Sequence, residues 1–168
     1  MKKILLAFGF AILVLGSCQA QKEKMKTIDK NGMKVSWHFE NERVYFEVSA
    51  PTNGWVTIGF NQNSEIQGAY LLMSNVIQDR VNVVEHYTIS AGNYKPITEL
   101  GSVAKVENIK GKEVGDSTQI AFSLPVGALS KYQKDLKPNM DYFMILAYSR
   151  ADDFQHHSMM RTHIKVTL

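Results

Sequence analysis

The residues with the most chemistry to offer stand together near the carboxyl end, in the string His156-His157-Ser158-Met159-Met160. Neutral imidazole nitrogens bind haem iron and other metals, and thioether sulfur is a soft ligand that suits Cu(I). Adjacent side chains of an extended strand point to opposite faces, so His156 and His157 can share one ion only within a loop. No third strong ligand stands at a fixed spacing, so a surface histidine pair is the alternative interpretation.

The sequence lacks the motifs of the common enzyme classes. It contains no Gly-x-Ser-x-Gly elbow, no His-Glu-x-x-His pair, no P-loop and no dinucleotide-binding string. The acidic residues show no paired pattern of the kind that glycosidases use. We therefore expect a protein that is not an enzyme, with a copper- or haem-dependent oxidoreductase as a minor alternative.

The amino-terminal segment has the layout of a secretory signal. Two lysines precede an apolar run that ends at Leu15 and is too short for a comfortable membrane span. The string from Leu15 to Cys18 resembles the lipobox of bacterial lipoproteins, which implies a signal peptide over residues 1–17 and a lipid on Cys18. The alternative is ordinary cleavage after Ala20. A lipid anchor predicts a protein of the bacterial cell envelope, held on a membrane and facing outside the cytoplasm.

Charge and cysteine content narrow the choice of ligand. Removal of residues 1–17 lowers the formal net charge from +3 to +1, because that segment holds two lysines and no acidic residue. A nearly neutral domain lacks the electrostatic footprint of a nucleic-acid binder, so we expect no nucleic-acid partner. Cys18 is the only cysteine, so a lipidated form has no thiol for a disulfide, a zinc site or a nucleophile.

The elements that must position these residues follow a period of two. Residues 19–30 are polar and lysine-rich, and with Cys18 they predict a flexible tether over 18–30, with a first edge strand as the alternative. Segments 69–77 and 142–149 are apolar on both faces and are therefore expected to be central strands. A short helix is expected around 128–136. The predicted strands are 33–40, 43–48, 55–60, 69–77, 81–89, 102–110, 118–124, 142–149 and 161–168. This pattern predicts one all-β domain, an antiparallel β-sandwich of about nine to eleven strands.

Two segments resemble the DOMON domain. One is the string Gly54-Trp55-Val56-Thr57-Ile58-Gly59-Phe60 with its following polar loop and Gly68-Ala69-Tyr70. The other runs from Ala147 through His157 to Arg161. The resemblance implies a DOMON-like domain over residues 31–168. That family has an immunoglobulin-like sandwich and binds haem or sugar, often in extracellular redox or adhesion proteins.

The resemblance also implies a set of site residues. In cytochrome members a b-type haem lies at one end of the sandwich, between a Met from the loop before a Gly-Ala-Asp string and a His before the last strand. The His falls on His157, but the Met falls on Ile66, which cannot bind iron, and the Asp is replaced by Tyr70. Arg161 lies beside the site. Met73 is a replacement thioether, although a strand Met usually fills core.

Two functions follow as expectations. The first is an envelope ligand-binding module of the DOMON type that holds haem b and exchanges electrons with a partner protein. The alternative is a cofactor-free carbohydrate-binding or adhesion module, in which aromatic faces stack on a sugar ring. Trp37 and Trp55 are expected in the core, whereas Tyr70 and Tyr94 are expected to be free because loops tend to carry function.

Overall fold

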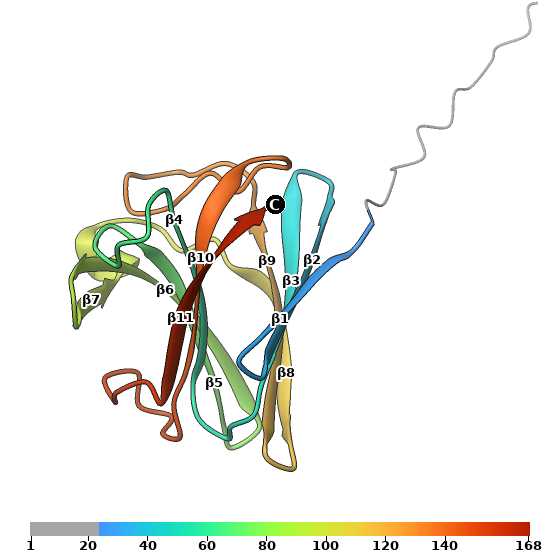
Figure 1. Cartoon of the computed structure of the whole chain (residues 1–168). Coiled ribbons are helices and arrows are strands. Elements are labelled where there is room, and N and C mark those ends of the chain that lie inside the picture. The colour runs from blue at the N-terminus through green and yellow to red at the C-terminus, as the bar shows by residue number, and fades with distance from the viewer. Residues whose placement is uncertain (1–23) are drawn as a thin grey trace, which may run out of the picture.

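The protein is described by a computed structural model over residues 24–168, so the signal segment and Cys18 lie outside the described residues. The described chain forms eleven strands in two antiparallel sheets that face each other (Figure 1). The expected all-β antiparallel sandwich is confirmed. The five-stranded sheet has the order β1 (Lys26–Lys30), β2 (Met33–Glu40), β3 (Arg43–Ala50), β9 (Ser117–Pro125) and β8 (Glu107–Val114). The six-stranded sheet has the order β11 (Met160–Thr167), β10 (Asp141–Tyr148), β4 (Val56–Asn61), β5 (Tyr70–Ile77), β6 (Arg80–Ser90) and β7 (Asn93–Pro96).

The core lies between the sheets and is built from the inward positions of the alternating strands. On β3, for example, the residues Val44, Phe46 and Val48 are all buried. The Phe46 ring packs tilted against Phe60 of the other sheet, with 5.5 Å between ring centroids. Such burial of alternate apolar side chains on both inner faces is what holds two sheets together.

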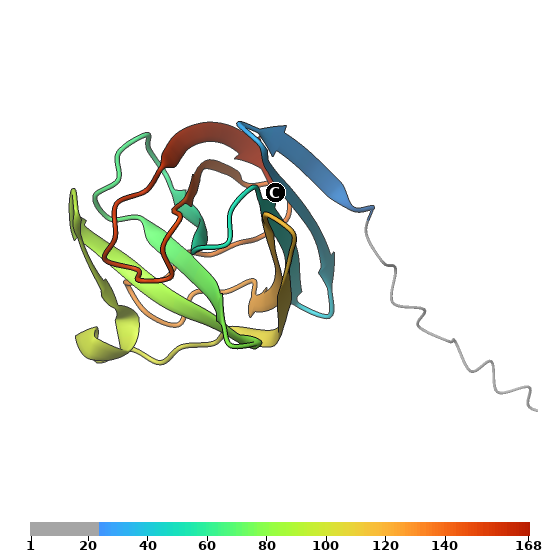
Figure 2. The same ribbon diagram turned by 90° about the horizontal axis from the view of Figure 1, so that it is seen from below.

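Three neighbouring strands of the six-stranded sheet are buried on both faces. Every residue of β4 is buried, and so is every residue of β5 except the last. The outer face of β10 is closed in the same way over its second half. Two loops provide the cover, residues 62–69 before β5 and residues 149–159 between β10 and β11. Figure 2 shows the second of these looping away from the five-stranded sheet.

Two local expectations were wrong. Residues 26–30 form strand β1, paired along its length with β2, so the tether cannot extend over them and the edge-strand alternative holds there. The segment 128–136 is a series of turns rather than a helix, and the side chain of Asp135 accepts a hydrogen bond from the backbone N–H of Ala128. Gly111 lies inside β8, where a Cβ would meet the Gln119 carbonyl oxygen at 2.7 Å, so this glycine allows β8 and β9 to pair closely.

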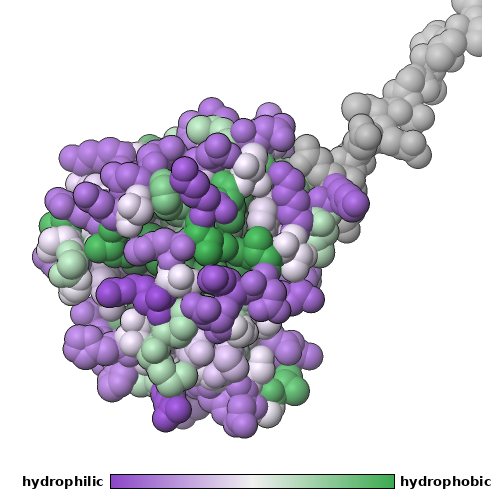
Figure 3. Space-filling view, in the orientation of Figure 1, coloured by the Kyte–Doolittle hydropathy of each residue, from purple (hydrophilic) through white to green (hydrophobic). Residues whose placement is uncertain are grey.

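The surface seen from the β1 and β11 side is mainly hydrophilic, with a short hydrophobic band at its centre (Figure 3). Edge strands of the two sheets adjoin here, and Lys26 Nζ donates to the carbonyl oxygen of Thr167 at 3.3 Å. Within residues 24–168, no helix has the length and apolarity needed to cross a membrane.

Candidate functional site

A cavity of about 140 Å³ lies against the outer face of the six-stranded sheet. Its floor comes from Leu71 and Met73 of β5 and from Ile145 and Ala147 of β10. These four side chains share a face because β4 lies between the two strands and pairs with both in an antiparallel register. They belong to a second apolar cluster, separate from the core between the sheets. The apolar outer faces of β5 and β10 are therefore explained by this cluster.

The walls come from Trp55, Ile66 and Tyr94. Trp55 precedes β4 and is only 4% exposed. A Cβ at the neighbouring Gly54 would stand 2.6 Å from the backbone of residues 149–151, so glycine is required at this position. The close approach that glycine permits brings the loop after β10 down onto the sheet, so this glycine helps to shape the cavity.

Ile66 is placed by the polar residues around it. The side-chain amide of Asn61 donates to the carbonyl oxygens of Glu65 and Gln67 at 2.8 and 2.9 Å. The backbone N–H of Gly68 donates to the carbonyl oxygen of Thr88 at 2.8 Å. The loop is thus fixed at its start and its end, and the half-buried Ile66 packs on the second cluster.

The segment 149–159, here called the strap, closes the cavity from the other side. The backbone N–H of Trp55 donates to the carbonyl oxygen of Ala151 at 3.0 Å, and Ser149 Oγ donates to the carbonyl oxygen of His157 at 3.0 Å. The hydroxyl of Tyr94 donates to the carbonyl oxygen of Phe154. The Trp55 and Tyr94 bonds join the strap to the residue before β4 and to β7, both distant from it in the sequence.

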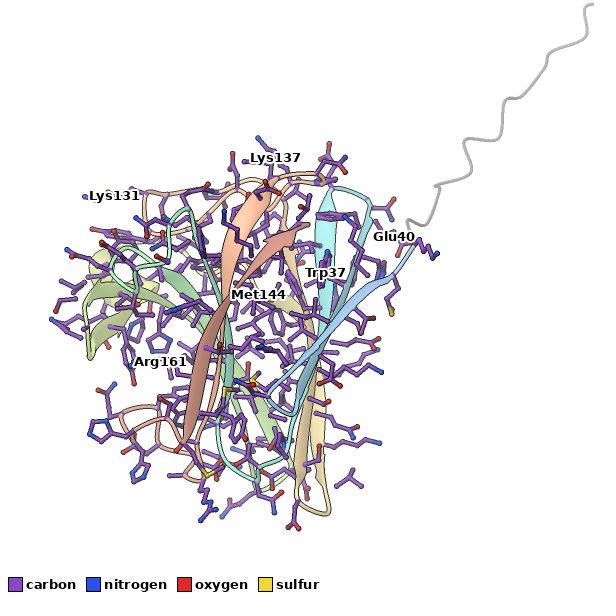
Figure 4. The ribbon with its side chains drawn as sticks, in the orientation of Figure 1. Trp37, Glu40, Lys131, Lys137, Met144 and Arg161 are labelled. Atoms are coloured by element: carbon purple, nitrogen blue, oxygen red, sulfur yellow. The ribbon has the colours of Figure 1, made fainter. Side chains whose placement is uncertain are left out.

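The mouth of the cavity carries the polar residues of the strap. His156 and His157 are exposed, and both line the cavity, as does exposed Arg161 at the start of β11. Figure 4 shows Arg161 on the side of β11 that faces away from the five-stranded sheet. Among the expected site residues, Ile66, His157 and Arg161 are thus brought together in one cavity.

Tyr70 was expected to be free in a loop, and that expectation was wrong. It is the first residue of β5, is 2% exposed and faces the core between the sheets. Its hydroxyl donates to Glu85 Oε2 at 2.7 Å. Burial, together with the charge of Glu85, raises its pKa well above the usual value. Glu85 also accepts from the Gln133 amide at 2.9 Å and from the Val106 N–H at 2.7 Å. This buried network therefore has a structural role, because it joins Tyr70 and Glu85 to two loop segments.

His86 is 2% exposed and lies beside the cavity wall formed by Tyr94. Its ring packs edge-on against Tyr94 and Phe154, at 5.6 and 5.8 Å between ring centroids. Its Nδ1 lies 3.1 Å from the carbonyl oxygen of Val84, which favours the tautomer with the proton on Nδ1. Burial lowers the pKa of His86. The aromatic residues Tyr94 and Phe154 were the available signal in the sequence, because large aromatic side chains outside the main strands suggest a second buried surface.

Three polar atoms around the cavity lack hydrogen-bond partners. They are the Trp55 indole Nε1 and the hydroxyl oxygens of Thr57 and Thr88, and all three residues line the cavity. The three atoms are also shielded from solvent, so the cavity must widen before a ligand reaches them. Unpartnered buried polar groups cost about 1–3 kcal/mol each, and a bound ligand would remove that penalty.

A larger groove of about 580 Å³ crosses the outer face of the five-stranded sheet. It is lined mainly by polar and lysine side chains, including Lys34, Lys110 and Lys112. None of its lining residues carries an unpartnered buried polar side-chain atom. The smaller cavity is therefore the better candidate for a built binding site.

The cavity in its present shape does not fit a porphyrin with two axial ligands. Ligand pockets for molecules well below haem in size start at about 300 Å³, roughly twice this volume. Ile66 offers no lone pair, and the one thioether in the lining is that of Met73, in the floor. The cavity also lies on a sheet face and not at an end of the sandwich. Among the described residues, no group of three or more His, Cys, Asp or Glu side chains could hold a metal ion.

Comparisons with known proteins agree with this architecture. The family model described as "DOMON domain" matches residues 29–149. A solved structure, the cytochrome b domain of pyranose dehydrogenase from Coprinopsis cinerea, has the same fold with a TM-score of 0.57 and 7% sequence identity. The match covers 84% of this chain and 80% of that one. No curated protein matches the sequence.

Proposed function

Because the chain belongs to the DOMON family, we propose that it is a ligand-binding module whose ligand occupies the cavity between the strap and the outer face of the six-stranded sheet. The observation that carries the proposal is the composition of this cavity. An apolar floor, two aromatic walls and three residues with unpartnered polar atoms line one space. Such a combination is typical of sites that bind small molecules.

The favoured ligand is a sugar ring. A dry cavity of about 150 Å³ accommodates benzene, so the present volume of about 140 Å³ is on the scale of one six-membered ring. The faces of Trp55 and Tyr94 can cover the C–H surface of such a ring. Its hydroxyl oxygens can accept from the Trp55 indole and exchange hydrogen bonds with Thr57 and Thr88. Sugar binding needs no cofactor, so this proposal includes no reaction.

A glycan array probed with purified residues 24–168 tests the proposal. We expect binding to a restricted set of glycans and a loss of about tenfold or more in the double variant Thr57→Val and Thr88→Val. Thr162→Val is the matched control, because Thr162 lies on β11 at an inward position and does not line the cavity. An array without binding, or binding that the double variant retains, contradicts the proposal.

Haem b is the second candidate. The fold shared with a cytochrome b domain supports it, and so does the presence of His157 and Met73 on one cavity. A porphyrin would require the strap to move away from the sheet. Added haem should then give a shifted Soret band that His157→Ala and Met73→Leu each alter and that His163→Ala does not. An unchanged spectrum of free haem refutes this candidate. A haem-loaded form would pass electrons to a partner protein.

The location belongs to the same proposal. A lipid on Cys18 would hold the domain at a membrane of the bacterial envelope, outside the cytoplasm. Expression with a labelled fatty acid should give a labelled protein in the membrane fraction. Cys18→Ser should abolish the label. Label that survives this substitution would refute the anchor.

A further inference from the structure

The polar residues that line the cavity carry positive charge or can donate hydrogen bonds, and none of them is acidic. Arg161 is the one residue of the lining with a permanent charge, and His156, His157 and Gln155 lie beside it at the mouth. Within the lining described by the structure there is no Asp or Glu. A neutral sugar needs no such cation, so a cavity with one permanent positive charge and no acidic residue suggests a ligand that carries a negative charge.

Arg161 has no counter-ion in the described part of the chain. The three ion pairs found there are His38–Glu40, Arg43–Glu107 and Lys137–Asp135. The carboxylate of Asp153 lies near Tyr94, where it adds to the effect of burial in raising the pKa of the phenol. That carboxylate accepts from the backbone N–H of Gln155 at 2.9 Å and is not part of the lining. The guanidinium is therefore available to an anion from outside.

The direction of the Arg161 side chain is set by the strand. Arg161 pairs with Ala147 across β10 and β11, and Ala147 is a floor residue of the cavity. Paired residues in an antiparallel sheet share a face, so the guanidinium rises from the same face as the floor. Its position at the mouth leaves the planar fork open to a carboxylate in a bidentate arrangement.

From this geometry we propose that the cavity selects a carboxylate-bearing ring, an acidic sugar of the hexuronate class, with the ring against Trp55 and Tyr94 and the carboxylate on Arg161. This inference rests on the proposed function and specifies its ligand class. It differs from that function in requiring discrimination between sugars that share a ring and differ only in the oxidation state of C6.

Isothermal titration at neutral pH with matched pairs tests the inference. The probes are D-galacturonate against D-galactose and D-glucuronate against D-glucose, titrated into purified residues 24–168. We expect one of the uronates to bind at least about tenfold more tightly than its neutral partner. Arg161→Gln should remove this preference, and Arg161→Lys should keep part of it because a point charge remains. Binding of the uronate should weaken at high salt.

Lys165→Gln is the matched control. Lys165 is exposed, lies on the same strand and face as Arg161, and packs its ammonium over the Phe143 ring outside the cavity. The substitution Lys165→Gln removes the same unit of charge as Arg161→Gln and should leave the preference for uronate over neutral sugar unchanged. Equal loss in Lys165→Gln and Arg161→Gln would mean a general field effect and would overturn the assignment to Arg161.

The outcomes separate the two levels of the argument. Equal binding of neutral and acidic partners refutes the inference and leaves the sugar-binding function standing. Binding of neither class of sugar to the unmodified domain refutes the inference, and together with a glycan array without binding it refutes both. Selective uronate binding that depends on Arg161 supports both.

Discussion

The hydroxyl of Thr88 provides a direct test of whether the cavity is built for a ligand at the expense of stability. Thr88 is 0% exposed and its Oγ1 has no partner, while its backbone N–H and carbonyl are both bonded. Valine has nearly the same shape and is likewise favoured in strands. Thr88→Val should therefore remove an unsatisfied polar group and leave the backbone pairing in place.

The expected gain follows from the cost of such a group. A buried polar atom without a partner costs about 1–3 kcal/mol, so the free energy of unfolding should rise by about 1 kcal/mol or more. For a domain of this size, that gain raises the melting temperature by about 3–4 °C. Sugar binding should weaken in the same variant, because the hydroxyl would be lost to the ligand.

Thr118 provides the opposite case within the same fold. It is also 0% exposed, but its hydroxyl donates to the carbonyl oxygen of Thr52 at 2.8 Å. Thr118→Val removes a satisfied group and leaves an acceptor unpaired, so it should lower stability by about 1–3 kcal/mol. Urea unfolding followed by circular dichroism measures both variants. Destabilisation of Thr88→Val comparable to that of Thr118→Val would show that the Thr88 hydroxyl is satisfied and would refute the reasoning.

Three further predictions concern single residues. Because burial lowers the pKa of His86, the unfolded chain binds more protons than the folded chain below about pH 6.5. Acid therefore favours unfolding, and the urea midpoint should fall between pH 7 and pH 5. The pKa of His163 is lowered too, so the test is made in a His163→Gln variant. Adding His86→Phe to that variant should flatten the change of the urea midpoint with pH, and an unchanged slope contradicts the prediction. Gly54→Ala should cost about 1–3 kcal/mol in thermal unfolding, because its Cβ would press on the backbone of the strap; an unshifted melting curve would refute this contact. Tyr70→Phe removes one donor from Glu85 and should cost about 1–3 kcal/mol in urea unfolding with sugar binding unchanged; impaired binding in folded protein would return Tyr70 to the site.

The sandwich could be predicted because apolar and polar residues alternate along the sequence in the same way as buried and exposed positions alternate along a strand. Strand β3 alternates in the sequence and is buried at alternate positions in the structure, and β5 is apolar on both faces and buried on both. The short strand β1 was predicted only as the alternative to a tether, because its five residues are half-buried or exposed and its pairing leaves no apolar pattern. β8 was placed too early because most of its residues are also exposed.

The site could be predicted only in part, for a related reason. Ile66, His157 and Arg161 were found through the resemblance to a family, and they do line one cavity. Period two shows which residues share a face, but it does not show whether a loop covers that face. The sequence therefore does not show that Tyr94 and Phe154 enclose His86.

The strap has a kinetic consequence. Hydrogen bonds join it to Trp55, just before β4, and to Tyr94 of β7, and the unpartnered polar atoms of the cavity are shielded from solvent. A ligand can reach those atoms only after the strap opens, so its association should be slower than the diffusion limit. Exit faces the same barrier. We therefore expect long residence times relative to the affinity, visible in stopped-flow traces of tryptophan fluorescence as an association rate that levels off at high ligand concentration.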